Sequence, residues 1–229
     1  MDSYAATRAR LEEYFDRTAA QTWARLTSDA PVSRIRQTVR EGRDRMRGLL
    51  LSRLPEDLRG ARVLDAGCGA GPMSFELAAR GAEVVAVDIS PSLLEVARKR
   101  MPPELEGRIA FHAGDMLDEG FGRFDHVVAM DSLIHYTAPD IAAALGRLAS
   151  RCRGGIAFTI APATPFLSTM HVAGKLSPRS DRSPAIIPHS MARIQRALDG
   201  VPEAAGRAIV DAGRVSSGFY ISQAMELRP

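Results

Sequence analysis

A short strand-like segment followed by a glycine-rich loop is the feature that most constrains the fold of this 229-residue chain. Residues 62–65 form an apolar run that leads to Gly67, Gly69 and Gly71, and residues 72–80 resume with helical spacing. Glycines at these positions let the backbone adopt positive φ and approach a ligand closely, while the following helix offers unpaired N–H groups. The pattern therefore predicts a strand, a tight loop and a helix that together hold a nucleotide-like cofactor.

The spacing of the glycines separates two kinds of cofactor. A dinucleotide site requires G-x-G-x-x-G, but Pro72 stands where the third glycine would fall. Asp65 precedes the glycines in the order D-x-G-x-G-x-G, and a carboxylate there suits a ligand with a cationic amino-acid end. This order resembles motif I of the class I S-adenosylmethionine (SAM) methyltransferases. The alternative reading of the motif alone, a generic Rossmann-like loop, stays open at this point.

Composition and charge exclude several other classes of protein. The chain is 45% hydrophobic and 25% charged, which is typical of a globular domain with a sizeable core. Cys68 and Cys152 show no disulfide or metal spacing and the five histidines show no ligand spacing, so we expect a cytoplasmic protein without a metal site. With a net charge of only +3, no recognition motif and no bilayer-length apolar run, we expect neither a nucleic-acid partner nor a spanning helix.

Strand and helix patterns alternate after the glycine loop. The expected later strands cover residues 83–88, 109–115, 124–131, 155–161, 207–215 and 218–227. Alternation of this kind predicts an α/β fold with a mostly parallel sheet. Together with the resemblance to motif I, the seven expected strands imply a Rossmann-like class I SAM methyltransferase fold. We expect an N-terminal helical cap over residues 1–60, a SAM-binding domain over 61–229, and within it a substrate-facing insert over 162–189, after the fifth strand.

Acidic residues at the ends of the strands extend the predicted cofactor site, because ligands of open α/β sheets bind outside the carboxyl ends of the strands. Asp88 ends the second strand about twenty residues after the loop, where a carboxylate can accept both ribose hydroxyls. Asp115 and Met116 suit an adenine amino group and its ring face. The predicted cofactor contacts are Asp65, Gly67, Cys68, Gly69, Gly71, Asp88, Ile89, Asp115, Met116 and Met130.

Residues 2–60 are expected to form two helices. Apolar residues share one face of the first helix: Leu11, Phe15, Ala19, Trp23 and Leu26. The second helix begins after a candidate N-cap at Ser33, ends by Pro55, and is crowded with arginines. Two readings stay open and are compatible: a cap packed on the core with a solvated basic face, or a lid whose arginines meet an acidic ligand, a partner or anionic lipid.

Five further segments carry a narrower resemblance. They are Tyr14-Phe15 with Trp23, Asp131–Tyr136 (DSLIHY), Phe158–Pro162 with Thr164-Pro165, Gly174–Pro184 (GKLSPRSDRSP) and Val215–Ser222 (VSSGFYIS). Together they resemble the magnesium-protoporphyrin IX O-methyltransferases of (bacterio)chlorophyll biosynthesis over nearly the whole chain. One departure is that Asp16-Arg-Thr-Ala-Ala20 stands where the family tends to carry Asn-Gly-Thr-Gly-Phe, which affects the detail of the cap contacts.

The resemblance implies methyl transfer from SAM to a propionate carboxylate of Mg-protoporphyrin IX, with His135 and Tyr14 as the leading catalytic candidates. The magnesium ion arrives within the substrate. The expected substrate contacts are Phe15, Trp23, Arg34, Arg36, Tyr136, Leu167, Met170, Lys175, Arg179 and Arg182. A porphyrin-binding subunit of magnesium chelatase as partner rests on the resemblance alone. Peripheral contact with the cytoplasmic face of a photosynthetic membrane would fit the apolar substrate and the arginine-rich helix.

Two alternatives to this reading remain from the sequence. One is a SAM methyltransferase that acts on another small acid or quinone-like substrate. The other is a porphyrin carrier that keeps the fold without turnover, which the intact Asp65, glycine loop, Asp88 and Asp115 disfavour.

Overall fold

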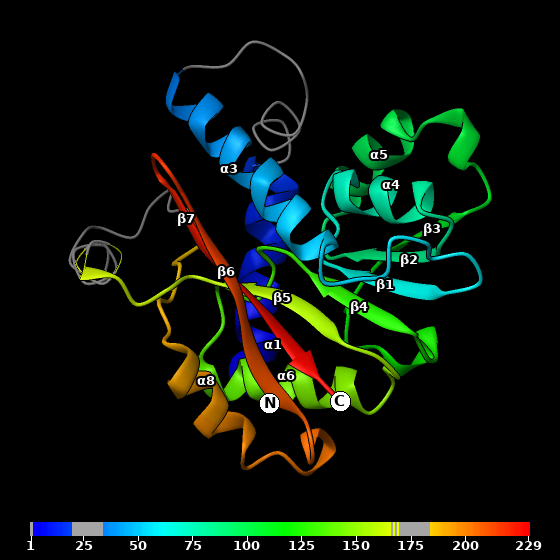
Figure 1. Ribbon diagram of the computed structural model, residues 1–229. Helices are drawn as coiled ribbons and strands as arrows, with labels where there is room; N and C mark the ends of the chain where they lie inside the picture. Colours follow the sequence, from blue (N-terminus) through cyan, green and yellow to red (C-terminus); the bar gives the residue numbers. More distant parts are fainter. Residues whose placement is uncertain (1, 20–33, 166, 168, 170–183) are drawn as a thin grey trace.

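The computed structural model describes residues 2–19, 34–165, 167, 169 and 184–229, and a seven-stranded sheet runs through this part of the chain (Figure 1). The strands are β1 (Arg62–Ala66), β2 (Glu83–Asp88), β3 (Ile109–Ala113), β4 (His126–Ala129), β5 (Ile156–Ile160), β6 (Ala208–Ser217) and β7 (Tyr220–Arg228). Their spatial order is β3-β2-β1-β4-β5-β7-β6. The first five are parallel, and β7 pairs antiparallel with both β5 and β6. The predicted mostly parallel, seven-stranded sheet is thereby confirmed.

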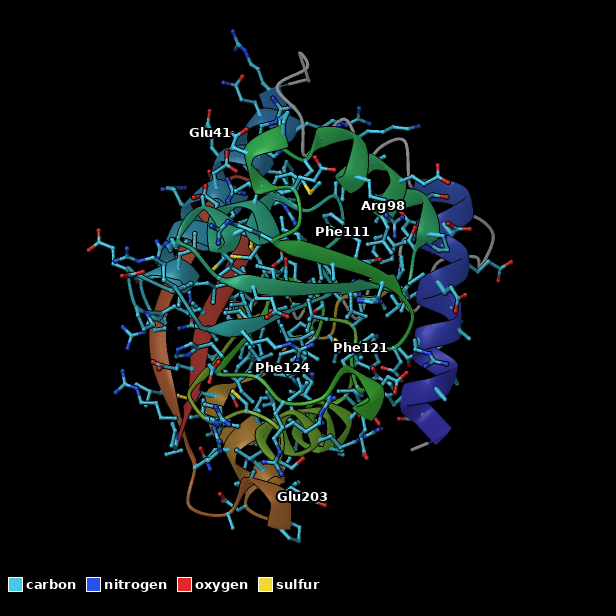
Figure 2. The ribbon with its side chains drawn as sticks, turned by 90° about the vertical axis from the view of Figure 1, so that its right-hand side faces the viewer. Glu41, Arg98, Phe111, Phe121, Phe124 and Glu203 are labelled. Atoms are coloured by element: carbon cyan, nitrogen blue, oxygen red, sulfur yellow. The ribbon has the colours of Figure 1, made fainter. Side chains whose placement is uncertain are left out.

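Helices cover both faces of the sheet (Figure 1). The α-helices are α1 (Asp2–Glu13), α3 (Arg34–Leu51), α4 (Pro72–Ala79), α5 (Pro91–Arg100), α6 (Ala138–Ala149) and α8 (Met191–Leu198). Buried apolar side chains form one cluster between the sheet and α1, α6 and α8, and a second cluster between the opposite face and α3, α4 and α5. Figure 2, seen from the β3 edge, shows Phe111 on one side of the sheet and Phe121 and Phe124 on the other. The arrangement is a three-layer α/β/α sandwich.

Local sequence signals place the helix starts. Ser90 accepts a hydrogen bond from the Leu93 amide at 3.3 Å, and Ser190 accepts one from the Arg193 amide at 3.3 Å. These serines satisfy amides that a helix start leaves unpaired. α5 and α4 also carry proline in their first turn, where no amide is needed.

The structure differs from expectation where two strands end. The third strand stops at Ala113 instead of Asp115, because Gly114 adopts a φ of 150° that leaves the strand geometry. The fourth strand covers only His126–Ala129, since Asp131 turns into the left-handed region with a φ of 56°. Both breaks direct the following residues toward the carboxyl edge of the sheet.

The N-terminal segment also departs from one continuous helix. α1 passes at Tyr14 into a π-helical segment, Tyr14–Ala19, which has a wider turn than an α-helix. The predicted apolar face of the first helix includes Trp23 and Leu26, which lie outside the described residues. The candidate N-cap Ser33 also lies outside them. In the part of the chain that the structure describes, no helix is long and apolar enough to cross a bilayer.

Candidate active site

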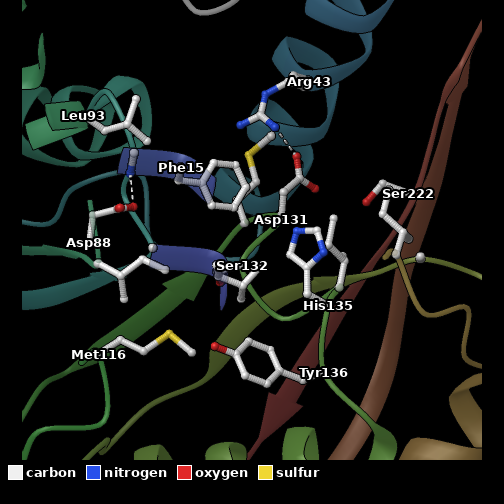
Figure 3. A pocket seen from close by; sticks show the side chains of 18 of the residues that line it. Phe15, Arg43, Asp88, Leu93, Met116, Asp131, Ser132, His135, Tyr136 and Ser222 are labelled. Carbon is white, nitrogen blue, oxygen red and sulfur yellow. Dashed lines mark hydrogen bonds and ion pairs between the residues drawn. The ribbon is translucent and has the colours of Figure 1, made fainter. Parts of the chain in front are cut away.

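A cavity of about 300 Å³ lies at the carboxyl ends of β1, β2 and β4 (Figure 3). Side chains from four separate parts of the chain enclose it: α1 with the π-helical segment, α3, the loops after the parallel strands, and the β6–β7 hairpin. The parallel strands place their loops at one edge of the sheet, as the crossover topology requires. Apolar side chains make up most of the wall, among them Leu11, Phe15, Val39, Met116 and Met130.

The glycine loop between β1 and α4 forms one side of the cavity. Gly67, Gly69 and Gly71 have φ values of 86°, 55° and 85°, a region that other residues rarely adopt. A Cβ at Gly67 would collide with Cβ of Ser132, and one at Gly71 would press on the ring of Phe75. At Gly69 a Cβ would meet nothing within 4 Å and would project from the cavity wall. The loop thus packs tightly on the protein at two glycines and leaves open space at the third.

Two buried carboxylates hold this loop in place. Asp88 accepts hydrogen bonds from the amides of Gly69 at 2.8 Å and Ser90 at 2.9 Å, and it lines the cavity. Asp65 lies behind the loop and accepts from the hydroxyl of Ser74 at 2.6 Å. Burial raises the pKa of both carboxyl groups, and the pKa of Asp65 is raised to about 7, with the charge of Asp88 adding to the effect. A cationic group near this pair would favour the ionised carboxylates.

The carboxylate of Asp115 turns toward α1 and not toward the cavity. It accepts hydrogen bonds from the Tyr4 hydroxyl at 2.8 Å, from Nη1 of Arg8 at 2.7 Å and from the Leu117 amide at 2.9 Å. In the described part of the chain, Gly114 and Met116 of this loop line the cavity, whereas Asp115 does not. The contact of Asp115 with an adenine amino group stays a prediction, and the structure shows that this carboxylate also anchors the N-terminal helix.

His135 and Tyr136 follow β4 at the cavity wall, as expected from the sequence (Figure 3). Nδ1 of His135 lies 3.2 Å from the carbonyl oxygen of Ala185, and the ring centroid lies 6.1 Å from that of Phe15. Burial lowers the pKa of His135, although the Ala185 carbonyl and Asp131 oppose the shift. Because a carbonyl only accepts, the proton of the neutral ring sits on Nδ1, which leaves Nε2 as an acceptor. The ring of Tyr136 stacks on Tyr4 with centroids 4.8 Å apart.

The remaining predicted residues divide into three groups. Besides those already placed, Ile89 and Leu167 line the cavity. Further predicted residues that do not line it, among those described, are Cys68, Gly71, Tyr14, Arg34 and Arg36. Cys68 is buried within the glycine loop, Gly71 faces the ring of Phe75, Tyr14 packs edge-on against Phe15, and the two arginines are exposed on α3. Trp23, Met170, Lys175, Arg179 and Arg182 lie outside the described residues.

Sequence reasoning missed several wall residues. Arg43 reaches the cavity from α3 and donates to Asp131 at 2.6 Å, and Tyr220 reaches it from β7. Asp131 and Ser132 carried a usable signal, because both follow a parallel strand at the edge where ligands bind. Arg43 carried no comparable signal, since it is one of seven arginines between residues 34 and 53.

Comparison with known proteins decides between the sequence-based alternatives for the family. The chain is 56% identical to a magnesium-protoporphyrin O-methyltransferase of Rhodobacter capsulatus over 227 residues, which are 99% of this chain and 98% of the relative. The chain belongs to the magnesium-protoporphyrin O-methyltransferase family. Within this family it is also 31% identical to a chloroplastic magnesium protoporphyrin IX methyltransferase of Arabidopsis thaliana, over 96% of this chain and 70% of the relative.

Family models and a solved structure agree with this membership. Residues 129–229 match the model of the magnesium-protoporphyrin IX methyltransferase C-terminus, and residues 63–155 match a methyltransferase domain. A crystal structure of magnesium protoporphyrin IX methyltransferase from Synechocystis PCC 6803 with bound S-adenosylhomocysteine (SAH) superposes with a TM-score of 0.81 at 28% identity. The match covers 96% of this chain and 99% of that one. The expected family and its SAM-dependent methyltransferase fold are confirmed.

The cavity fits the cofactor of this family. Gly69 and Gly114 line it with open space where a Cβ would stand, so a ligand can approach the backbone closely. The hydroxyl of Ser132 is buried at the wall without a hydrogen-bond partner in the described part of the chain, and such a group needs a polar partner. Asp88 adds a carboxylate at the position suited to a ribose. Among the described residues no cluster of three metal-ligating side chains occurs.

Proposed function

We propose that this chain transfers the methyl group of SAM to a propionate carboxylate of Mg-protoporphyrin IX, giving the monomethyl ester and SAH. The observation that carries the proposal is the 56% identity to the Rhodobacter capsulatus enzyme over essentially both full lengths. The cavity beside the glycine loop supports it, because its walls combine a few polar groups with a mostly apolar lining, as small-molecule sites do.

The bound cofactor supplies an electrophilic methyl group on a sulfonium cation. The residues of this chain supply the surroundings. A carboxylate anion and a sulfonium cation give neutral products, so the transition state carries less separated charge than the reactants and is favoured by a dry, low-dielectric pocket. Leu11, Phe15 and Met116 exclude water from the described wall, and we propose that the N-terminal cap, residues 1–60, closes this side of the SAM-binding domain, residues 61–229.

We propose that the macrocycle lies against the mouth of the cavity. A volume of about 300 Å³ is at the lower end of small-molecule sites, which leaves no room for a tetrapyrrole beside a cofactor. Ile186 and Phe219 line the cavity and are 43% and 60% exposed, so they offer apolar surface from the wall to the solvent. The insert, residues 162–189, contributes Leu167 and Ile186 to this side.

His135 is proposed to act on the reacting carboxylate. A propionate with an ordinary pKa of about 4.3, the value for a glutamate side chain, is already ionised at neutral pH, so a general base is not obligatory. Desolvation raises the pKa of such an acid, and the acceptor Nε2 of a neutral His135 can then take its proton. Tyr14 is proposed to contact the substrate and not the cofactor, because it packs against Phe15 from outside the described wall.

An arginine clamp is proposed for the second propionate. A bidentate guanidinium on the reacting carboxylate would stabilise the charged ground state more than the partly neutralised transition state. The exposed Arg34 and Arg36, with Arg179 and Arg182, are the candidates. Their replacement should mainly raise KM, whereas replacing His135 or Tyr14 should mainly lower kcat. A clamp variant with normal KM and collapsed kcat would refute this assignment.

Membrane and protein partners also remain proposals. Exposed arginines along α3 would attract an anionic lipid surface on the cytoplasmic face, where the apolar substrate partitions. Salt-sensitive sedimentation with anionic vesicles, absent with neutral vesicles, tests this contact. Binding to the porphyrin-carrying subunit of magnesium chelatase rests on family membership and is tested by co-sedimentation of the two purified proteins.

The deciding experiment is ester formation from Mg-protoporphyrin IX and SAM by the purified chain, followed by chromatography of the monomethyl ester. Turnover of a quinone-like or other small acid with no turnover of the porphyrin would favour the broader methyltransferase reading. Porphyrin binding by titration without SAM binding would favour the carrier reading.

A further inference from the structure

The carboxylate of Asp131 joins four separate parts of the structure beside the cavity, and Figure 3 shows its contact with Arg43. It accepts hydrogen bonds from Nη1 of Arg43 on α3 at 2.6 Å and from the hydroxyl of Tyr220 on β7 at 3.1 Å. The hydroxyl of Thr159 on β5 lies 3.2 Å from it and also accepts from the Asp131 amide at 2.7 Å. The side chain is only 8% exposed, and Asp131 itself starts the loop that follows β4.

The backbone at Asp131 is strained. Its φ is 56°, and within the described part of the chain Asp131 is the one residue other than glycine with a left-handed conformation. Such a conformation costs energy, although Asp tolerates it better than most residues, and it persists only where the surroundings fix it. Here the conformation is held by hydrogen bonds: the Asp131 amide donates to the Thr159 hydroxyl, and its carboxylate accepts from Arg43, Tyr220 and Thr159.

The strained turn aims the loop that carries the candidate catalytic group. Ser132 follows directly and packs against Gly67 of the cofactor loop, while His135 lies three residues further on at the wall. Arg43 brings the middle of cap helix α3 to the same point, and Tyr220 brings the C-terminal hairpin. The contacts of this one carboxylate therefore connect helix α3 and the C-terminal hairpin to the loop that carries His135.

We propose that Asp131 is a positioning residue for methyl transfer: through Arg43, Tyr220 and Thr159 it fixes the loop from Ser132 to Tyr136 against the cap and the cofactor loop. The inference rests on the proposed function for its kinetic part. Reaction rates depend steeply on alignment, since misplacement by about 1 Å can cost about 100-fold. Asp131 needs no contact with the substrate for this role.

The pair Arg43–Asp131 also fits the charge balance of the site. A lone carboxylate in an apolar wall would repel an incoming substrate anion, and burial makes that repulsion strong. Pairing with Arg43, whose side chain is 17% exposed, compensates the charge of Asp131 at the wall. At this part of the cavity wall the carboxylate of Asp131 is thus paired with a cation.

The test compares Asp131→Asn and Tyr220→Phe with a matched control, Glu226→Gln. Asn keeps the size and one acceptor oxygen but loses the charge that Arg43 requires, and Phe removes a single hydroxyl. Glu226 is a similarly buried carboxylate on β7, 10% exposed, paired with Arg53 at 2.9 Å just beyond α3, and it lies away from the cavity. Two readouts apply: hydrogen–deuterium exchange of residues 131–136 in the free enzyme, and kcat, KM and the Kd for SAH.

We expect faster exchange in residues 131–136 for Asp131→Asn, a kcat lowered by about 10- to 100-fold, and little change in the Kd for SAH. Tyr220→Phe should show the same pattern more weakly and serves if Asp131→Asn does not fold. Glu226→Gln should lower thermal stability and leave exchange of residues 131–136 and kcat unchanged. Wild-type exchange and kcat in both site variants would overturn the proposal, as would an equal loss in Glu226→Gln. If the wild type does not methylate the porphyrin, the proposed function fails, while the exchange comparison still decides the role of Asp131.

Discussion

The hydroxyl of Tyr4 donates a 2.8 Å hydrogen bond to the carboxylate of Asp115, two residues after the end of β3. The ring of Tyr4 stacks on Tyr136, so one side chain of α1 bridges the loops after two strands of the sheet. Burial raises the pKa of Tyr4 above its ordinary value, and the neighbouring Asp115 adds to the shift, so the phenol stays a donor. Helix α1 is therefore fixed over the cavity by a specific polar contact in addition to apolar packing.

Replacing Tyr4 by Phe should destabilise this docking. The variant keeps the ring and removes a hydrogen bond to a charged acceptor, which contributes about 1.5–3 kcal/mol to stability. Thermal unfolding monitored by circular dichroism at neutral pH measures the loss. Arg10→Ala on the exposed face of the same helix is the control and should change stability by less than about 0.5 kcal/mol. Equal stability of Tyr4→Phe and the wild type would show that apolar packing alone holds α1.

The sheet was predictable from the sequence because its inner strands, such as β1, β2 and β5, are buried on both faces. Continuous apolar runs such as residues 83–88 are a strong local signal, and the serine caps of α5 and α8 marked their helices. The predicted ends of the third and fourth strands were wrong. Gly114 and Asp131 end these strands through backbone conformations that hydrophobic periodicity does not reveal. The sequence therefore predicted the topology better than the edge of the sheet, where the site lies.

The site was predictable in its loops and not in its long-range pairs. Gly69, Asp88 and His135 end or follow parallel strands and lie at the cavity as expected. The contacts of Asp115 with Tyr4 and Arg8 were not predicted, because these partners lie on a helix more than a hundred residues away in sequence. Spacing gives no information on such contacts, because they depend on how the cap packs on the sheet.

The raised pKa of Asp65 predicts a proton-linked cofactor affinity. Its folded pKa of about 7 exceeds the ordinary value of 3.8, so the folded chain holds a proton on this group as the pH rises from about 4 to about 7, and stability falls across that window. A cofactor with a cationic end favours the ionised carboxylate, so binding near pH 7 should release a proton and tighten as the pH rises. Calorimetric titration of SAM in buffers of different ionisation enthalpy measures the release. Asp65→Asn should abolish it, and an unchanged release in this variant would assign the proton to another group.

The lowered pKa of His135 predicts that kcat, measured as a function of pH, falls only in acid solution, which gives the profile an acid limb. Burial disfavours the charged ring and lowers its pKa from 6.5, so the imidazole is neutral at pH 7 and charges only in more acid solution. If neutral Nε2 acts on the substrate, kcat should be level near pH 7 and fall only below pH 6.5. His135→Gln should lower kcat by about 100-fold, the lower end for loss of a proton-transfer group, and remove this limb.

His126 provides the control for that profile. Burial lowers its pKa as well, but it lies in β4 and does not line the cavity within the described part of the chain. His126→Gln should keep the wild-type kcat and its acid limb. An acid limb that survives in His135→Gln and disappears in His126→Gln would exclude the proposed role of His135.

Alanine variants of Gly69 and Gly107 distinguish the effect of backbone strain from that of a steric block in the cofactor site. Both have positive φ, 55° and 79°, and a Cβ on either would meet nothing within 4 Å, but only Gly69 lines the cavity. Alanine at either position should cost about 1–2 kcal/mol of stability, because the left-handed conformation is unfavourable with a Cβ. Gly69→Ala should in addition weaken SAH binding, measured by calorimetry, since its methyl group occupies space where a ligand would contact the loop. Gly107→Ala should bind SAH as the wild type does. Equal SAH affinity in the two variants would mean that the cofactor does not approach the backbone at Gly69, and the glycine loop would then have a purely structural role.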